Sequence, residues 1–273
     1  MRKPGMRSAA AAVVATGALL AGTAVAPSVA VASSGVRTIT VTMTAKSIRF
    51  STGTTLTAGR AIIKVVSPKG NHALQLIKLQ AGYPPKQANH DVNAAFGGDL
   101  KAIHRVDTKI LWLGGAPAAP HHPGRFVETL YAGTLYATDQ NGNAFAKINV
   151  VGSPGASGWV ANSSTITVVR PNRFRTTSTL PRSGYTLFRN SAAEPHMLVF
   201  QQVKKSTTHK DVNDYIKSGG HGNPPWALPE ATAASVISPG TQILFQYHLP
   251  AGRYLLTCFW PDKSSGMPHF FMG

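Results

Sequence analysis

The sequence predicts an all-β protein made of two tandem Greek-key β-sandwich domains, each with one short helix. Short segments in which apolar and polar residues alternate recur about every ten residues, which is the pattern of strands separated by turns. A stretch rich in glycine, serine and proline at Gly152–Gly158 has the composition of a linker and divides the chain near its middle. The same anchor residues occur in the same order before and after this stretch, so one β-rich fold is expected twice.

Local patterns predict the elements of the first half. Strands are expected at 38–42, 61–66, 72–77, 126–130, 134–138 and 146–151, with Asn141-Gly142 as a turn. A Pro-Pro pair at 84–85 opens a segment whose apolar residues from Val92 to Phe96 have helical spacing, and a Gly-Gly pair at 97–98 ends it. Residues 114–124 are rich in alanine, proline and histidine and predict a loop.

Matching residues recur in both halves of the chain. Phe50, Leu56 and His72 match Phe174, Leu180 and His196 at a constant offset of 124 residues. Further along, Leu130-Tyr-Ala-Gly133 matches Leu249-Pro-Ala-Gly252, and Asp139 stands where the second half has Cys258. Chance could supply one such match, but several in the same order indicate two copies of one domain.

The first residues predict an exported protein. Residues 1–32 combine a basic start, an apolar run from about 9 to 26 and Ala30-Val-Ala32 before Ser33, which is the pattern of a cleaved signal peptide. No later stretch supplies the ~18 consecutive apolar residues that a spanning helix requires, so no stable membrane span is expected after cleavage. The predicted location is extracellular or associated with the cell envelope.

The charge predicts attraction to polyanions. The chain has 27 basic and 10 acidic residues, a net charge of +17, and removal of the signal peptide with its three basic residues leaves +14. Outside a cell the available polyanions are wall polymers, anionic lipid surfaces and acidic partner proteins. Because the basic residues are scattered, with no Arg-rich helix and no aromatic-interleaved basic motif, nucleic acid is not an expected partner.

The last stretch of the chain holds candidate metal ligands. Cys258 is the only cysteine, so it cannot form an internal disulfide. A strand-like run leads to it, and the following Pro/Asp/Ser/Gly loop ends in His269, with Met272 three residues later. A thiolate, an imidazole and a thioether form the ligand set that copper prefers. The alternative, that Cys258 is a small buried apolar residue, stays open at this point.

The second half resembles the cupredoxins, the blue-copper sandwiches of the plastocyanin and azurin kind, in an exported bacterial two-domain form. The resemblance rests on Pro195-His196 on an early strand, Pro250-Ala-Gly252-Arg-Tyr254, Cys258-Phe259, Pro261-Asp262, Gly266 and Pro268-His269. It implies a mononuclear type 1-like site with one copper ion, held by His196, Cys258 and His269, with Met272 as a weak axial ligand. It also implies electron transfer or copper carriage, with a redox partner protein.

The first half keeps His72 but has Asp139 in place of the cysteine, so we expect it to be copper-free, with His72 an ordinary hydrogen-bonded histidine. The predicted organisation is a signal peptide at 1–32, a degenerate cupredoxin-like domain at 33–152, a linker at 153–164 and a domain with the candidate copper site at 165–273. His90, His104, His121 and His122 could in principle bind a metal, but loop histidines without a carboxylate or thiolate nearby are expected to be exposed.

The alternatives to copper binding are a metal-free binding module and an enzyme. A metal-free cupredoxin-like module could bind anionic envelope polymer or a partner protein through its basic surface. An enzyme is not expected, because the sequence has no His-x-His pairs for a trinuclear copper cluster, no Gly-x-Ser-x-Gly and no His-Glu-x-x-His. Its few acidic residues also give no sign of the paired carboxylates of a glycosidase.

Overall fold

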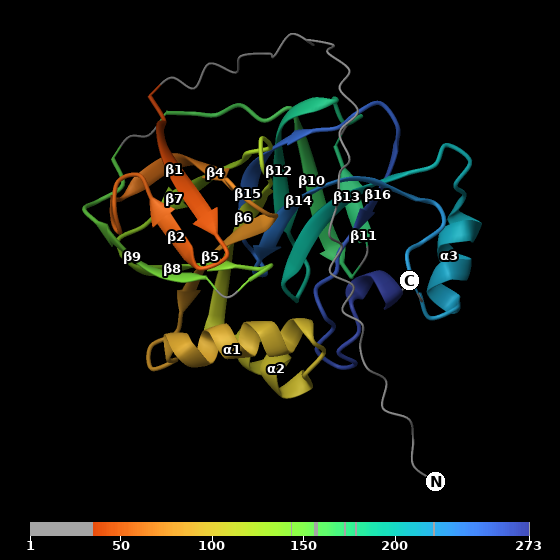
Figure 1. Cartoon of the computed structure of the whole chain (residues 1–273), viewed down its shortest axis with the longest axis horizontal. Coiled ribbons are helices and arrows are strands. Elements are labelled where there is room, and N and C mark those ends of the chain that lie inside the picture. The colour runs from red at the N-terminus through yellow and green to blue at the C-terminus, as the bar shows by residue number, and fades with distance from the viewer. Residues whose placement is uncertain are drawn as a thin grey trace.

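The computed structural model confirms an all-β sandwich, formed by two mixed eight-stranded sheets (Figure 1). It describes residues 35–142, 144–155, 158–171, 173–177, 179–220 and 222–272, so the predicted signal peptide at 1–32 lies outside the described residues. None of the helices in the described part of the chain is both long enough and apolar enough to cross a membrane.

The two sheets and their helices have the following bounds. The first sheet contains β1 (Arg37–Thr44), β2 (Ser47–Phe50), β4 (Gly59–Val66), β7 (Gly124–Leu130), β10 (Ser164–Arg170), β11 (Arg173–Thr176), β12 (Ser183–Asn190) and β15 (Gln242–His248). The second contains β3 (Thr55–Thr57), β5 (His72–Leu79), β6 (Ile110–Ala118), β8 (Gly133–Asp139), β9 (Phe145–Val151), β13 (His196–Val203), β14 (Ala227–Ile237) and β16 (Arg253–Thr257). The helices are α1 (Pro85–Phe96), α2 (Leu100–Lys109), α3 (His209–Lys217) and the 3-10 helix η1 (His269–Met272).

Both halves of the chain contribute strands to both sheets. β7 pairs antiparallel with β15, and β6 pairs antiparallel with β14, so the sheets run without a break from one half to the other. Phe126 of β7 lies opposite Phe245 of β15, and these residues hold equivalent positions in the repeat. An antiparallel pair whose equivalent residues face each other has a two-fold axis between them. Because the two halves share their sheets, strand pairing does not mark where one domain ends. The linker at 153–164 therefore stays a prediction.

The repeat extends to strand order and register. β1 pairs antiparallel with β2 and parallel with β4, and β10 pairs in the same way with β11 and β12. In the second sheet Gln75 lies opposite Thr138, and the equivalent Val199 lies opposite Thr257. These pairings are therefore the same in the two halves.

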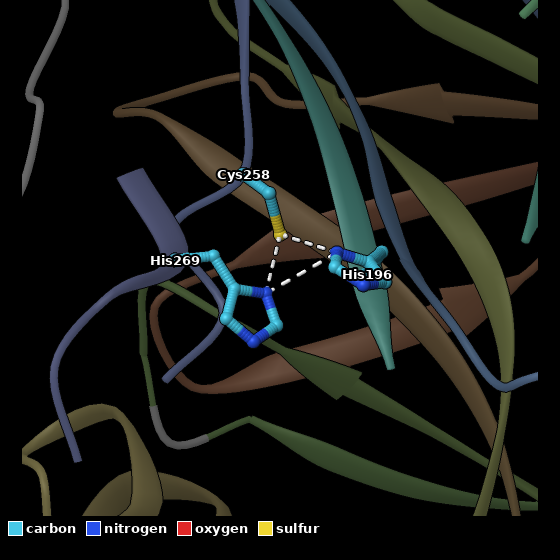
Figure 2. Close-up of side chains that lie close together, drawn as sticks. All are labelled: His196, Cys258 and His269. Atoms are coloured by element: carbon cyan, nitrogen blue, oxygen red, sulfur yellow. Dashed lines mark hydrogen bonds between the residues drawn. The ribbon is translucent and has the colours of Figure 1, made fainter. Parts of the chain in front are cut away.

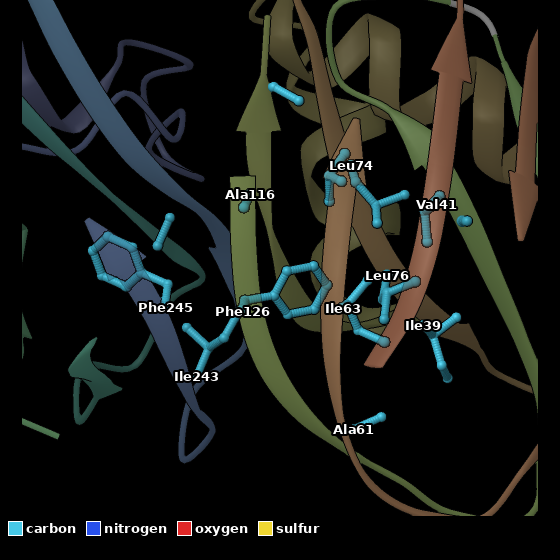
Figure 3. Close-up of a cluster of buried hydrophobic side chains, with 14 of the residues drawn as sticks. Ile39, Val41, Ala61, Ile63, Leu74, Leu76, Ala116, Phe126, Ile243 and Phe245 are labelled. Atoms are coloured by element: carbon cyan, nitrogen blue, oxygen red, sulfur yellow. The ribbon is translucent and has the colours of Figure 1, made fainter. Parts of the chain in front are cut away.

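The core lies between the two sheets and spans both halves (Figure 3). The largest buried cluster takes alternate residues from its strands, such as Ile39 and Val41 of β1 and Leu74 and Leu76 of β5. This period of two is what a strand with one face on a core requires. Phe126 and Phe245 extend the same cluster across the junction of the halves, so one continuous core holds the halves together.

Two predictions for the first half are wrong in detail. The half carries two helices rather than one, because Asp99 caps a second helix by accepting the N–H of Ala102 at 2.9 Å, and α2 then buries Ile103 and Val106. Residues 114–118, predicted as loop, belong to strand β6. A side chain at Gly115 would collide with the backbone carbonyl of Leu74, so this glycine permits close pairing with β5.

The α1–α2 hairpin is held by one buried carboxylate. Asp91 of α1 is fully buried and accepts hydrogen bonds from Nε and Nη2 of Arg105 of α2, both at 2.7 Å. It also accepts the Tyr83 hydroxyl at 2.7 Å and the Gln87 amide at 2.9 Å. The Arg105 guanidinium is the main reason that the pKa of Asp91 lies well below its usual range.

The first prediction concerns the pH dependence that this carboxylate creates. Because the folded-state pKa of Asp91 is depressed, its contribution to stability is complete above the unfolded pKa of about 4 and declines as the pH falls below it. Asp91→Asn should therefore lower the denaturant midpoint at pH 7 and flatten the fall in stability between about pH 5 and pH 2. Asp214→Asn removes an exposed ion pair with Lys210 and should leave this slope unchanged. Equal slopes for Asp91→Asn and the unaltered protein would contradict the prediction.

Candidate metal centre

His196, Cys258 and His269 meet in the second half of the protein (Figure 2). Nδ1 of His196 lies 3.2 Å from Sγ of Cys258, and Nδ1 of His269 lies 3.5 Å from the same sulfur. The two Nδ1 atoms are 3.2 Å apart. All three side chains are 0% exposed, so the three atoms form a closed triangle away from solvent.

Strand register brings the first two residues together. Leu198 and Cys258 occupy opposed positions on β13 and at the end of β16, because Val199 lies opposite Thr257. His196 precedes Leu198 by two residues and so points to the same face of the sheet. His196 and Cys258 are therefore diagonal neighbours on two antiparallel strands. Residues in this relation are close enough for an imidazole ring to contact a thiol.

A folded loop brings His269 back to the same place. The carboxylate of Asp262 accepts the backbone N–H groups of Ser264 and Ser265, at 3.0 and 2.7 Å, and turns the chain. The N–H of His269 then donates to the carbonyl of Trp260 at 2.8 Å. These contacts explain how a loop with ten residues between Cys258 and His269 still places the imidazole beside the thiol.

Glu194 orients the His269 ring. Nε2 of His269 lies 3.2 Å from a carboxylate oxygen of Glu194, whose other oxygen lies 3.5 Å from Nζ of Lys263. Proton donation from Nε2 to this carboxylate leaves a lone pair on Nδ1, directed at the triangle. Sequence reasoning missed Glu194, although it lies only two residues before His196, in the bend that leads into the same strand.

Burial keeps the two imidazoles neutral. It lowers the pKa of His196 to about 3, and the neighbouring His269 acts in the same direction. Burial also lowers the pKa of His269, although the Glu194 carboxylate opposes this shift. Neutral imidazole is the form that binds a metal ion.

The same burial holds the thiol protonated in the absence of a metal. It raises the pKa of Cys258 to about 12, against the hydrogen bonds from the backbone amides of Met197 and Trp260. A metal ion bound to this sulfur would have to displace the thiol proton. The two amides would then remain as donors to the thiolate.

The three atoms fit a metal ion. Their separations average about 3.3 Å, so the centre of the triangle lies about 1.9 Å from each atom, close to the roughly 2.0–2.3 Å of metal bonds to nitrogen and sulfur. Two neutral nitrogens and one potential thiolate also form a donor set that suits copper. His196, Cys258 and His269 are thus the residues that could hold the ion.

Met272 and the other histidines considered as metal ligands do not join this triangle. Met272 ends η1, the helix that His269 begins, and is 43% exposed, so its thioether would have to turn inward to act as a ligand. The side chain of His90 is 73% exposed, and His104, His121 and His122 are also exposed. The structure thus brings together three of the four predicted ligands.

The equivalent position in the first half contains a hydrogen-bonded pair. Nδ1 of His72 lies 2.6 Å from the carboxylate of Asp139, as predicted for an ordinary buried histidine. Asp139 also accepts the backbone N–H groups of Ala73, at 3.0 Å, and Asn141, at 3.1 Å. These amides are the counterparts of the Met197 and Trp260 amides, which donate to Cys258. The carboxylate of the first half therefore has the same neighbours as the thiol of the second, a histidine and two backbone amides.

The α1–α2 hairpin of the first half packs on the ligand loop of the second. Trp260, two residues after Cys258, lies edge-on to Trp112 of β6 and to Phe96 of α1, with ring centroids 4.9 and 5.3 Å apart. Gly266 approaches the turn between α1 and α2 so closely that a Cβ there would lie 2.7 Å from the carbonyl oxygen of Gly98. The first half therefore covers the candidate metal centre of the second.

Comparisons with known proteins give limited information. The chain matches no protein-family model, and a search of curated proteins finds no match either. Among solved structures, auracyanin A, a blue copper protein of Chloroflexus aurantiacus, is 18% identical, with a TM-score of 0.31, and the match covers 43% of this chain and all of that one. The Lac15 protein from a marine metagenome and a multi-copper oxidase of Pediococcus acidilactici are 11% and 10% identical, with TM-scores of 0.22 and 0.21. The chain covers only 63% and 53% of those two proteins, and likenesses this slight assign no family.

The second prediction tests the contact between the hairpin and the ligand loop. Gly266 has φ +71°, and Gly240 has φ +74° with no atom near its virtual Cβ. Gly240→Ala should cost roughly 1–2 kcal/mol of unfolding free energy for its backbone conformation alone. Gly266→Ala should cost at least about 1 kcal/mol more, because its methyl group meets the Gly98 carbonyl. Denaturant unfolding measures both values, and equal losses would show that the close approach contributes nothing.

Proposed function

We propose that this protein binds one copper ion through His196, Cys258 and His269 and that it transfers electrons or carries copper outside the cell. The observation that carries the proposal is the buried triangle formed by two Nδ1 atoms and Sγ, with separations of 3.2, 3.2 and 3.5 Å. Copper bound by two imidazoles and a thiolate cycles between Cu(I) and Cu(II). The cupredoxin resemblance of the second half supports the same assignment.

The protein's own contribution is to hold these ligands with little freedom. Glu194 fixes the His269 ring through Nε2, and the amides of Met197 and Trp260 donate to the sulfur. The strands β13 and β16 fix His196 and Cys258 at their backbone. Ligands fixed in this way reorganise little when the charge of a bound ion changes, which favours electron exchange.

We further propose that the protein is a carrier rather than an enzyme. All three ligand side chains are 0% exposed, so none of them is in direct contact with solvent, which disfavours direct contact between a substrate and the bound ion. Electron exchange requires no such contact. Met272 is a possible axial ligand in this proposal, but the three buried residues define the site.

The third prediction tests copper binding directly. Purified protein given Cu(II) should bind one ion per chain and develop a thiolate-to-copper absorption band in the visible region. Cys258→Ser should abolish the band, because the band requires the thiolate sulfur. His104→Ala, which alters an exposed histidine of α2, should keep both the band and the stoichiometry. Absence of the band from the unaltered protein, or its persistence in Cys258→Ser, would refute the proposal.

The fourth prediction concerns the residue that orients His269. Glu194→Ala removes the acceptor for Nε2 and should weaken copper affinity about ten-fold or more, measured by competition with a chelator of known affinity. Glu194→Gln keeps an acceptor oxygen and should lose less. If both variants bind copper as tightly as the unaltered protein, Glu194 has no part in the site.

A further inference from the structure

The two halves differ at one edge of the sandwich. In the first half, β8 pairs on one side with β5 and on the other with β9, and β9 pairs in turn with β3. In the second half, β16 takes the place of β8 and pairs with β13. Within the described residues no strand pairs with the other side of β16, which ends the second sheet.

Apolar positions near this edge that are buried in the first half, on β2, β3 and β8, are more exposed in the second. Phe50 and Leu56 are 7% and 3% exposed, whereas their counterparts Phe174 and Leu180 are half-buried. Ala137 of β8 is 0% exposed, and its counterpart Leu256 of β16 is also half-buried. Phe174, Leu180 and Leu256 still pack against the main core, so the uncovered edge is a continuation of that core.

The first half also shows what kind of segment fits. β9 runs antiparallel to β8 and directs Ile148 and Val150 into the core at 1% and 2% exposure, while its alternate residues face outward. Ile148 lies opposite Leu135, and Ala146 lies opposite Ala137. An extended segment with apolar residues at every second position would pair with β16 in the same way.

Charge selects among the possible occupants. Strand β11 ends the first sheet and β16 ends the second (Figure 1). Arg173 and Arg175 of β11 and Arg253 of β16 are exposed. A second copy of the chain carries the same positive net charge, +17 for the full sequence and +14 without the signal peptide, and is repelled by this edge. An acidic segment is attracted to it, and electrostatic complementarity of this kind raises the rate and specificity of association.

We propose that the free edge of β16 is a docking site for an acidic, extended segment of a partner protein, which adds to the sheet as an antiparallel strand. Backbone hydrogen bonds to β16 would supply part of the affinity, and alternate apolar side chains would cover Phe174, Leu180 and Leu256. The outward-facing residues of the segment would be acidic and would meet the arginines of β11 and β16. The site is separate from the copper ligands, so the proposal does not depend on metal binding.

The fifth prediction tests this docking site with a synthetic peptide of the length of β9 that alternates valine with glutamate. The peptide should bind the full chain and slow hydrogen exchange at those amides of Leu255, Leu256 and Thr257 that point away from β13. The double variant Arg173→Glu/Arg175→Glu should weaken binding at least ten-fold. Arg49→Glu alters the equivalent strand β2 of the first half, where β9 covers the edge, and should leave binding unchanged. A peptide with a central proline should not bind.

Other outcomes would overturn the proposal. Slow exchange of these amides in the dilute protein without peptide would mean that the chain's own residues cover the edge. Slow exchange that appears with rising protein concentration, together with a dimer in sedimentation, would identify a second copy as the occupant. Failure of the peptide to bind, or binding that leaves the β16 amides unprotected, would exclude strand addition at this site.

Discussion

The pairing register of β13 with β16 is the constraint on which the candidate metal centre depends. With Val199 opposite Thr257, His196 and Cys258 lie on the same face of the sheet as diagonal neighbours. A slip of one residue would turn one of them to the other face. The same register recurs in the first half, where Gln75 lies opposite Thr138 and places His72 beside Asp139. The fold thus places one residue beside the histidine in each half. Whether that residue is an aspartate or a cysteine decides the chemistry of the pair.

The two strand ends show how one backbone arrangement serves a hydrogen-bonded pair and a candidate metal site. Asp139 and Cys258 each contact the histidine that begins the neighbouring strand. Each also accepts hydrogen bonds from two backbone amides that hold equivalent positions in the two halves. The difference lies in the loop that follows. In the first half, the N–H of Asp139 bonds back to the Ala144 carbonyl at 3.1 Å, so the turn is tight. The longer loop of the second half has room to return His269 to the sulfur.

The sequence allowed the β-sandwich, the repeat and the candidate residues His196, Cys258 and His269 to be predicted, because each depends on local patterns or on matching residues. It did not reveal that the halves share their sheets, because β6–β14 and β7–β15 pairing joins residues more than a hundred positions apart. Strand β6 was missed since Gly115 is required by the approach of β5, and Gly114 by the approach of Ile243 of β15, rather than by local preference. Glu194 was missed because its role follows from where the loop returns His269.

The shared sheets give the first half a structural role in the proposed site. Because β6 and β14 are paired, the α1–α2 hairpin that precedes β6 lies over the ligand loop of the other half, with Trp260 packed against Phe96 and Trp112. Cys258 and Trp260 lie in one buried cluster with Val92 of α1 and Ile103 of α2, so the hairpin contributes to the burial that raises the pKa of the thiol. A single sandwich without the hairpin would leave the loop uncovered. The copper-free half that the sequence predicts would therefore be retained because it controls the environment of the ligands, even though it contributes none of them.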